Sequence, residues 1–247
     1  MTTWMLGRIL WAAAILPPLV LLLDIYRRDR VEKEPPKLLA ALFFGGAVSV
    51  LPAALLERAG FALAGRILPA ASVPHAALCC FAAVGLVEEG GKFLVLRLGS
   101  WRSPAFNYRF DGIVYAVFVS MGFALVENLL YVAGDGTLAT ALLRSVTAIP
   151  GHASFAVFMG FYYGTAKLYA DAAGRCREPR RAAECLALAR RNRLRAFWIP
   201  VLLHGFYDFC LDARLPWMGA VFFLFVLLLD AAAICQVRTA GRHDLPV

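Results

Sequence analysis

Seven apolar runs, each long enough to cross the hydrocarbon core of a bilayer, dominate this sequence of 247 residues. A membrane-spanning helix needs roughly 20 apolar residues, and backbone polar groups inside a bilayer can be satisfied only within helices or closed barrels. With 61% hydrophobic residues and a mean hydropathy of +0.67, we expect a single all-α integral membrane domain over residues 1–247. The predicted spans are residues 4–25, 38–56, 76–98, 111–133, 142–168, 196–213 and 216–236.

Residues 57–75 are apolar but short, and Pro69 and Pro74 interrupt them. They favour an interfacial helix, or an eighth span if the segment inserts.

The net charge of +8 is concentrated between the apolar runs. Of the 25 Lys and Arg residues, 20 lie after the first, third, fifth or seventh span or toward the end of the third and fifth spans. Positive residues mark cytosolic connections, so we expect the N-terminus outside and the C-terminus in the cytosol. The same distribution argues against a nucleic-acid partner. The basic segment 171–195, with Pro179 at a first-turn position, favours a cytosolic amphipathic loop or helix in contact with membrane lipids.

Several polar residues interrupt the apolar runs. Each ionised carboxylate at the centre of a bilayer costs roughly 2.5–3.5 kcal/mol on insertion scales, so these residues are expected to meet partners or water inside the bundle. They lie at similar depths in four spans, which is the arrangement of a shared site. The residues are Glu88, Glu89, Glu127, Asn128, His152, His204 and Asp208.

Helical spacing places some of these residues on common faces. Glu88 and Lys92, like His204 and Asp208, are four residues apart and project from the same side of a helix. Gly90, Gly91, Pro150 and Pro200 lie close to the polar positions and predict broken helices around a hydrated cavity.

Four motifs resemble the PrsW family of intramembrane proteases, a relative of the CAAX prenyl endopeptidases and bacteriocin-processing enzymes. In order, the sequences "EEGGK", "FALVEN", "GHASFAVFMGFYYG" and "HGFYDF" resemble EExxK, FxxxEN, an isolated histidine and HxxxD. CAAX members carry FxxxH and usually HxxxN, whereas this chain has Glu127 and Asp208 at the final positions. The resemblance implies cleavage of a single-span membrane protein, such as an anti-sigma factor, in a bacterial cell membrane.

Peptide hydrolysis requires a base that activates water and groups that stabilise the oxyanion and protonate the leaving amine. Glu88 is the predicted base by its match to the first motif residue, with Glu89 assisting. The predicted catalytic residues are Glu88, Glu89, Glu127, His152, His204 and Asp208, with Lys92 and Asn128 supporting them.

His152, His204 and Glu127 also form a candidate zinc set, although the helical HExxH signature is absent. Metal-dependent and metal-free hydrolysis both fit the sequence. A proton- or cation-coupled transporter is the alternative function, because intramembrane Glu, Asp and His also form proton relays.

Overall fold

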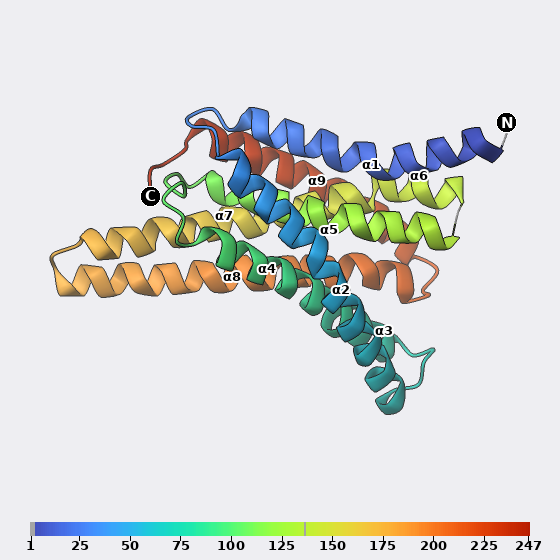
Figure 1. The fold of residues 1–247 in the computed structure, drawn as a ribbon. Helices are drawn as coiled ribbons and strands as arrows, with labels where there is room; N and C mark the ends of the chain where they lie inside the picture. The colour runs from blue at the N-terminus through green and yellow to red at the C-terminus, as the bar shows by residue number, and fades with distance from the viewer. Residues whose placement is uncertain (1–2, 136) are drawn as a thin grey trace.

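The computed structural model describes residues 3–135 and 137–247, and these residues are almost entirely helical (Figure 1). Within them, extended pairing is limited to one bridge between Tyr108 and Pro246. The all-α prediction is therefore confirmed. In chain order the elements are α1 (Thr3–Arg28), α2 (Pro36–Ile67), α3 (Val73–Leu78), the π-helical segment η1 (Cys79–Gly85), α4 (Leu86–Ser100), α5 (Asp111–Asp135), α6 (Leu138–Val146), α7 (Ala148–Arg175), α8 (Pro179–Asp212) and α9 (Met218–Arg242).

Among the described residues, four helices are long and apolar enough to cross a membrane by length and composition alone: Arg8–Arg28, Pro36–Ile67, Asp111–Gly134 and Met218–Arg242. In α5, 67% of the most apolar window is buried inside the protein, against 28–33% in the other three helices. Helix α5 is thus the central helix of the bundle, whereas α1, α2 and α9 turn much of their apolar surface outward.

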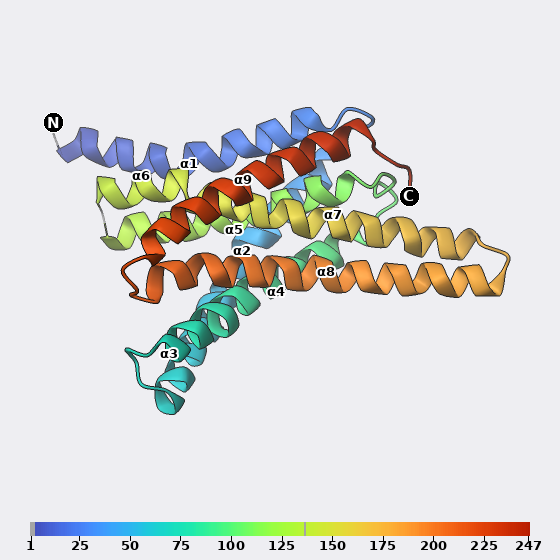
Figure 2. The same ribbon diagram turned by 180° about the vertical axis from the view of Figure 1, so that it is seen from behind.

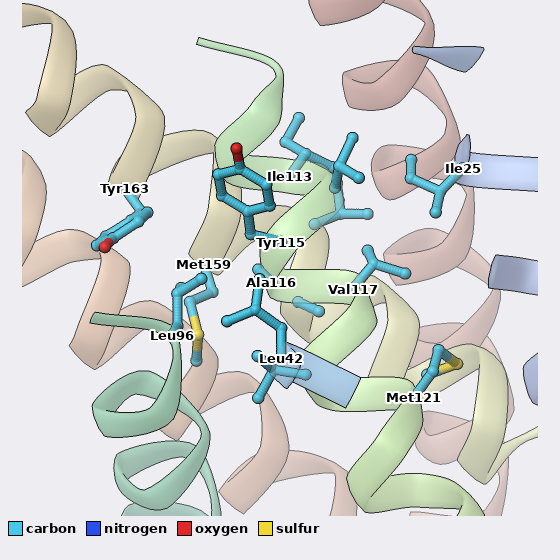
Figure 3. Packing of buried hydrophobic residues seen from close by; sticks show 14 of the residues in the cluster. Ile25, Leu42, Leu96, Ile113, Tyr115, Ala116, Val117, Met121, Met159 and Tyr163 are labelled. Carbon is cyan, nitrogen blue, oxygen red and sulfur yellow. The ribbon is translucent and has the colours of Figure 1, made fainter. Parts of the chain in front are cut away.

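Helix α5 packs directly against α1, α2 and α7. Its contact with α2 depends on Gly122, because a Cβ there would lie 1.9 Å from the carbonyl oxygen of Phe43. Small residues allow this close approach between membrane helices. Figure 3 shows the main apolar cluster around α5, where Leu42, Ile113 and Met159 come from three different helices and are almost fully buried.

The predicted boundaries differ from the structure in two places. Residues 57–67 continue α2 rather than forming a separate interfacial helix, and the chain turns before α3 begins at Val73. The predicted span 142–168 is divided at Thr147 into α6 and α7. Hydropathy alone could not detect either change, because Glu57 and Arg58 interrupt the apolar run where α2 continues, whereas apolar residues lie close to Thr147 on both sides.

The prediction of broken helices at the polar positions was wrong for the glycines and prolines named. Gly90 and Gly91 lie inside α4, Pro150 lies in the first turns of α7, and Pro200 lies within α8. The irregular backbone is instead the π-helical segment η1, which immediately precedes α4.

Helices α7 and α8 form a long hairpin that extends beyond the rest of the bundle (Figures 1 and 2). Near Gly164, α7 contacts the backbone of Arg109, just before α5 begins, yet α7 continues to Arg175. The 11 further residues project about 16 Å past that level at 1.5 Å per residue. Pro179 begins α8 as predicted, but most of 171–195 belongs to this hairpin rather than to a separate helix.

The last residues of the chain lie at the end of the bundle from which the α7–α8 hairpin projects. They contact the connection between α4 and α5, which in turn contacts the connection between α1 and α2. Asn107 donates to Glu32 at 2.9 Å, and the backbone N–H of Phe110 donates to Asp244 at 2.9 Å. Glu34 is buried here and accepts a hydrogen bond from the hydroxyl of Tyr115. Burial raises the pKa of Glu34 to about 7.

Candidate active site

Glu88 and Glu89 lie in the first turn of α4, directly after η1. π-helical turns are rare and are frequent at functional sites. The segment η1 packs against α8 at Gly205, where a Cβ would lie 2.9 Å from the Cα of Phe81. Gly205 lets α8 and η1 approach closely. The preceding residue, His204, therefore reaches Glu89 in the first turn of α4.

Lys92 is buried beside both glutamates, with a side chain only 1% exposed. Its ammonium donates to Glu88 at 3.1 Å and to Glu89 at 2.7 Å, and it lies 3.1 Å from Nδ1 of His152. A lysine ammonium has three donors and no acceptor, so Nδ1 of His152 must accept. The proton of a neutral His152 is then on Nε2.

Nε2 of His152 in turn donates to Glu127 at 2.8 Å. The second oxygen of Glu127 pairs with Arg144 at 3.0 Å, and Arg144 donates to Asn128 at 2.9 Å. Asn128 donates to the carbonyl of Ala14 at 3.4 Å. Side chains from α5 and α6 therefore orient the imidazole on α7, and Asn128 connects this network to α1.

His204 lies between two carboxylates. Its Nδ1 is 2.9 Å from Glu89, and its Nε2 is 3.4 Å from Asp208. The ring stacks on Phe155 with a centroid separation of 4.9 Å, and it lies 5.2 Å from the ring of His152. Only the imidazolium donates from both nitrogens, so the two carboxylates suit a positively charged His204. As a metal ligand, His204 would instead be neutral and free of a proton on the coordinating nitrogen.

A cavity of about 650 Å³ opens next to these groups. Glu88, Glu127, His152, His204 and Asp208 line it, whereas Glu89 is not part of its lining and faces Lys92 and His204 instead. The two adjacent glutamates thus have different surroundings. Glu88 is the one in contact with space that can hold water or substrate.

All six side chains predicted as catalytic lie in this one region, and Lys92 lies among them. Asn128 lies behind the site and contacts it through Arg144. The cavity is also lined by residues that were not predicted, among them Arg144 and Glu57. Arg144 lies in α6, whose separation from α7 was not predicted, and Glu57 lies just past the predicted end of the second span. An ionisable residue that close to an apolar run was the available signal for Glu57.

Four buried residues are close enough to bind one metal ion. Ligand atoms of Glu88, Glu89, His152 and His204 all lie within 4.8 Å of one another. In addition, Oε2 of Glu89 is buried without a hydrogen-bond partner among the described atoms, so an acceptor is available for a cation. Carboxylate and imidazole ligands suit zinc, and the donor set fits a metal ion.

This group differs from the predicted zinc set of His152, His204 and Glu127. Glu127 is held by Arg144 and His152 and lies outside the group. The carboxylates in the group are Glu88 and Glu89, because the turn of α4 that carries them is the one that faces both histidines.

The fold and the site define a polytopic helical membrane protein with carboxylates and imidazoles gathered beside a cavity inside the bundle. The model of the PrsW family of intramembrane metalloproteases matches residues 34–232. The chain belongs to this family, and it is a membrane-embedded protease.

Bacterial relatives agree over most of the length. Protease PrsW of Geobacillus kaustophilus is 33% identical over 236 residues, which cover 95% of this chain and 93% of that protein. Protease PrsW of Bacillus subtilis is 32% identical over 84% of each chain, and that of Clostridioides difficile is 30% identical over 96% of this chain and 94% of its own. No solved structure gives a significant match. These relatives favour the protease over the transporter that the sequence also allowed.

Proposed function

We propose that the protein is an endopeptidase that cleaves a membrane-anchored regulatory protein, for example an anti-sigma factor, with Glu88 as the base that activates water. The observation that carries the proposal is the different position of the two glutamates. Glu88 lines the cavity, whereas Glu89 is directed toward Lys92 and His204. Glu88 is therefore the carboxylate that substrate and water can reach.

In the proposed reaction, Glu88 takes a proton from water as the water oxygen attacks the scissile carbonyl. His204 lines the cavity and lies beside Asp208, which suits it to donate a proton to the leaving amine as the C–N bond breaks. Glu89 and Lys92 hold Glu88 and His204 in place. To stabilise the oxyanion, His152 would redirect its Nε2–H from Glu127 to the substrate oxygen.

A metal ion would be held by Glu88, Glu89, His152 and His204, and zinc would polarise the carbonyl and lower the pKa of a bound water. Lys92 already contacts three of these residues, so the chain also supplies a positive charge of its own beside them.

We also propose seven spans, with the N-terminus outside. Three segments, α3 to α4, α7 and α8, would cross the membrane in addition to the four strongly apolar helices. They carry both histidines and most of the charged groups of the site, which lowers their hydropathy. Helix α1 begins at one end of the bundle and the chain ends at the other (Figure 1), which supports an odd number of crossings. In this orientation the arginines of the α7–α8 hairpin face the cytosol and its anionic lipids.

The test of the base is Glu88→Gln, which keeps the shape of the side chain and removes its charge. Membrane proteomes of the wild type and the variant are compared for a single-span protein that accumulates uncut. Glu184→Gln, an exposed glutamate on the hairpin, is the matched control and is expected to cleave normally. Wild-type cleavage by Glu88→Gln would overturn the assignment of the base. Metal analysis of the purified wild-type protein, and measurement of its cleavage activity with and without a chelator, decide whether activity requires a metal.

A further inference from the structure

The cavity beside the site extends away from the catalytic groups along one face of α2. Val50, Ala54, Glu57 and Phe61 line it, at spacings of four, three and four residues, which place them on one side of the helix. Leu55 and Leu56, on other faces of the same turn, are 69% and 58% exposed. Glu57 therefore faces the cavity while its neighbours face the bilayer.

Carboxylates outnumber cations along the cavity. Arg144 is the only Lys or Arg among the described residues that line it, and Arg144 is paired with Glu127 at 3.0 Å. Glu88 is paired with Lys92 at 3.1 Å, and Asp208 lies 3.4 Å from His204. The positive groups near the site are thus engaged by carboxylates other than Glu57.

Glu57 is half-buried and has no hydrogen bond or ion pair within the described part of the chain. It nevertheless interacts electrostatically with Glu88, Glu127, His204 and Lys92, so its carboxylate lies within range of the catalytic groups. An ionisable residue in a membrane helix normally pairs with another group or marks a ligand site. The described residues supply no such partner for Glu57, which leaves its charge available to a molecule in the cavity.

The depth of Glu57 indicates the part of a substrate that it meets. It lies 21 residues after Pro36, the start of α2, or about 32 Å along the helix. That length is close to the roughly 30 Å thickness of the hydrocarbon core, so Glu57 lies toward the membrane boundary opposite the α1–α2 connection. In the proposed orientation this boundary is the outer one.

We infer that Glu57 is a specificity residue that binds a Lys or Arg in the outer juxtamembrane segment of the substrate, close to the scissile bond. The inference rests on the proposed function. Outer flanks of single-span proteins are poor in Lys and Arg compared with inner flanks. A requirement for one basic residue at this position would therefore separate substrates from most other membrane proteins.

The test uses a library of single-span reporters reconstituted with the purified protein in liposomes. Each reporter carries Lys, Gln or Glu at one of ten successive positions in its outer juxtamembrane segment. The wild type is expected to prefer Lys at one or two adjacent positions. Glu57→Gln should lose about 10- to 100-fold in kcat/KM on those reporters, mainly through a higher KM because the contact forms before the chemical step.

Glu57→Lys should reverse the preference and favour Glu at the same positions, while Glu184→Gln should keep the wild-type preference. Because Glu57 has no hydrogen bond or ion pair among the residues that the structure describes, its variants should accumulate and melt like the wild type, which separates specificity from folding. An unchanged Lys preference in both Glu57 variants would overturn the inference and leave the proposed function intact. If no reporter is cleaved in a Glu88-dependent manner, the proposed function fails, and this inference fails with it.

Discussion

Replacing Lys92 with Met is the most direct test of how the centre of the site is held together. Met is unbranched like Lys but carries no charge and no donor. The substitution removes the contacts of the ammonium with Glu88 at 3.1 Å, Glu89 at 2.7 Å and His152 at 3.1 Å. The side chains of Lys92 and Glu89 are each only 1% exposed, so water cannot replace the lost partner.

The expected loss follows from the burial of both carboxylates. Removing one partner of a buried ion pair typically costs about 3–5 kcal/mol, because the other charge is left uncompensated. Exchanging both partners for neutral groups of similar size is often neutral or stabilising. Lys92→Met should therefore destabilise strongly, and the double variant with Glu89→Gln should recover much of the loss.

Thermal unfolding of the purified protein in lipid nanodiscs measures this effect. For a chain of this size, 3–5 kcal/mol corresponds to a Tm lower by about 6–20 °C. The control is Lys167→Met, which breaks the more exposed pair with Asp171 at 2.9 Å and should cost at most about 1 kcal/mol. Equal Tm values for Lys92→Met and Lys167→Met, with no recovery in the double variant, would refute the reasoning.

Two further predictions concern helix packing and pH. Gly122→Ala should destabilise the bundle by at least about 1–3 kcal/mol, the usual cost of overpacking, because the new Cβ would lie 1.9 Å from a backbone oxygen of α2. Gly65→Ala, where a Cβ meets nothing within 4 Å, is the control, and equal Tm values for the two variants would contradict the prediction. Burial raises the pKa of Glu34 from 4.5 to about 7, so the folded state holds this proton more tightly than the unfolded chain. Its contribution to the free energy of unfolding is fully present below pH 4.5 and is lost as the pH rises to about 7. Glu34→Gln should therefore make Tm depend less on pH in this range. A pH profile of Tm that is the same in Glu34→Gln and the wild type would contradict the prediction.

Most of the helical architecture could be predicted because its signals are local. Apolar runs mark the central parts of α1, α2, α5 and α9, and Pro179 marks the start of α8. The errors arose where a helix breaks inside an apolar segment or continues through charged residues. The division at Thr147 and the extension of α2 past residue 56 are of this kind.

The sequence by itself determined that the chain enters a membrane as helices, and which polar residues those helices carry inward. Both follow from composition and from spacing along single helices, such as the four residues that separate Glu88 from Lys92.

Only the tertiary structure decided which groups meet across helices. It directs Glu88 toward the cavity and Glu89 toward Lys92 and His204, and it pairs Glu127 with Arg144. It also places Glu57 beside the cavity, with no ion pair to any residue in the described part of the chain. The physical reason is that contacts between helices depend on how each helix is rotated and how closely it approaches its neighbours, and this is set by packing at positions such as Gly122 and Gly205 rather than by the order of residues within one helix.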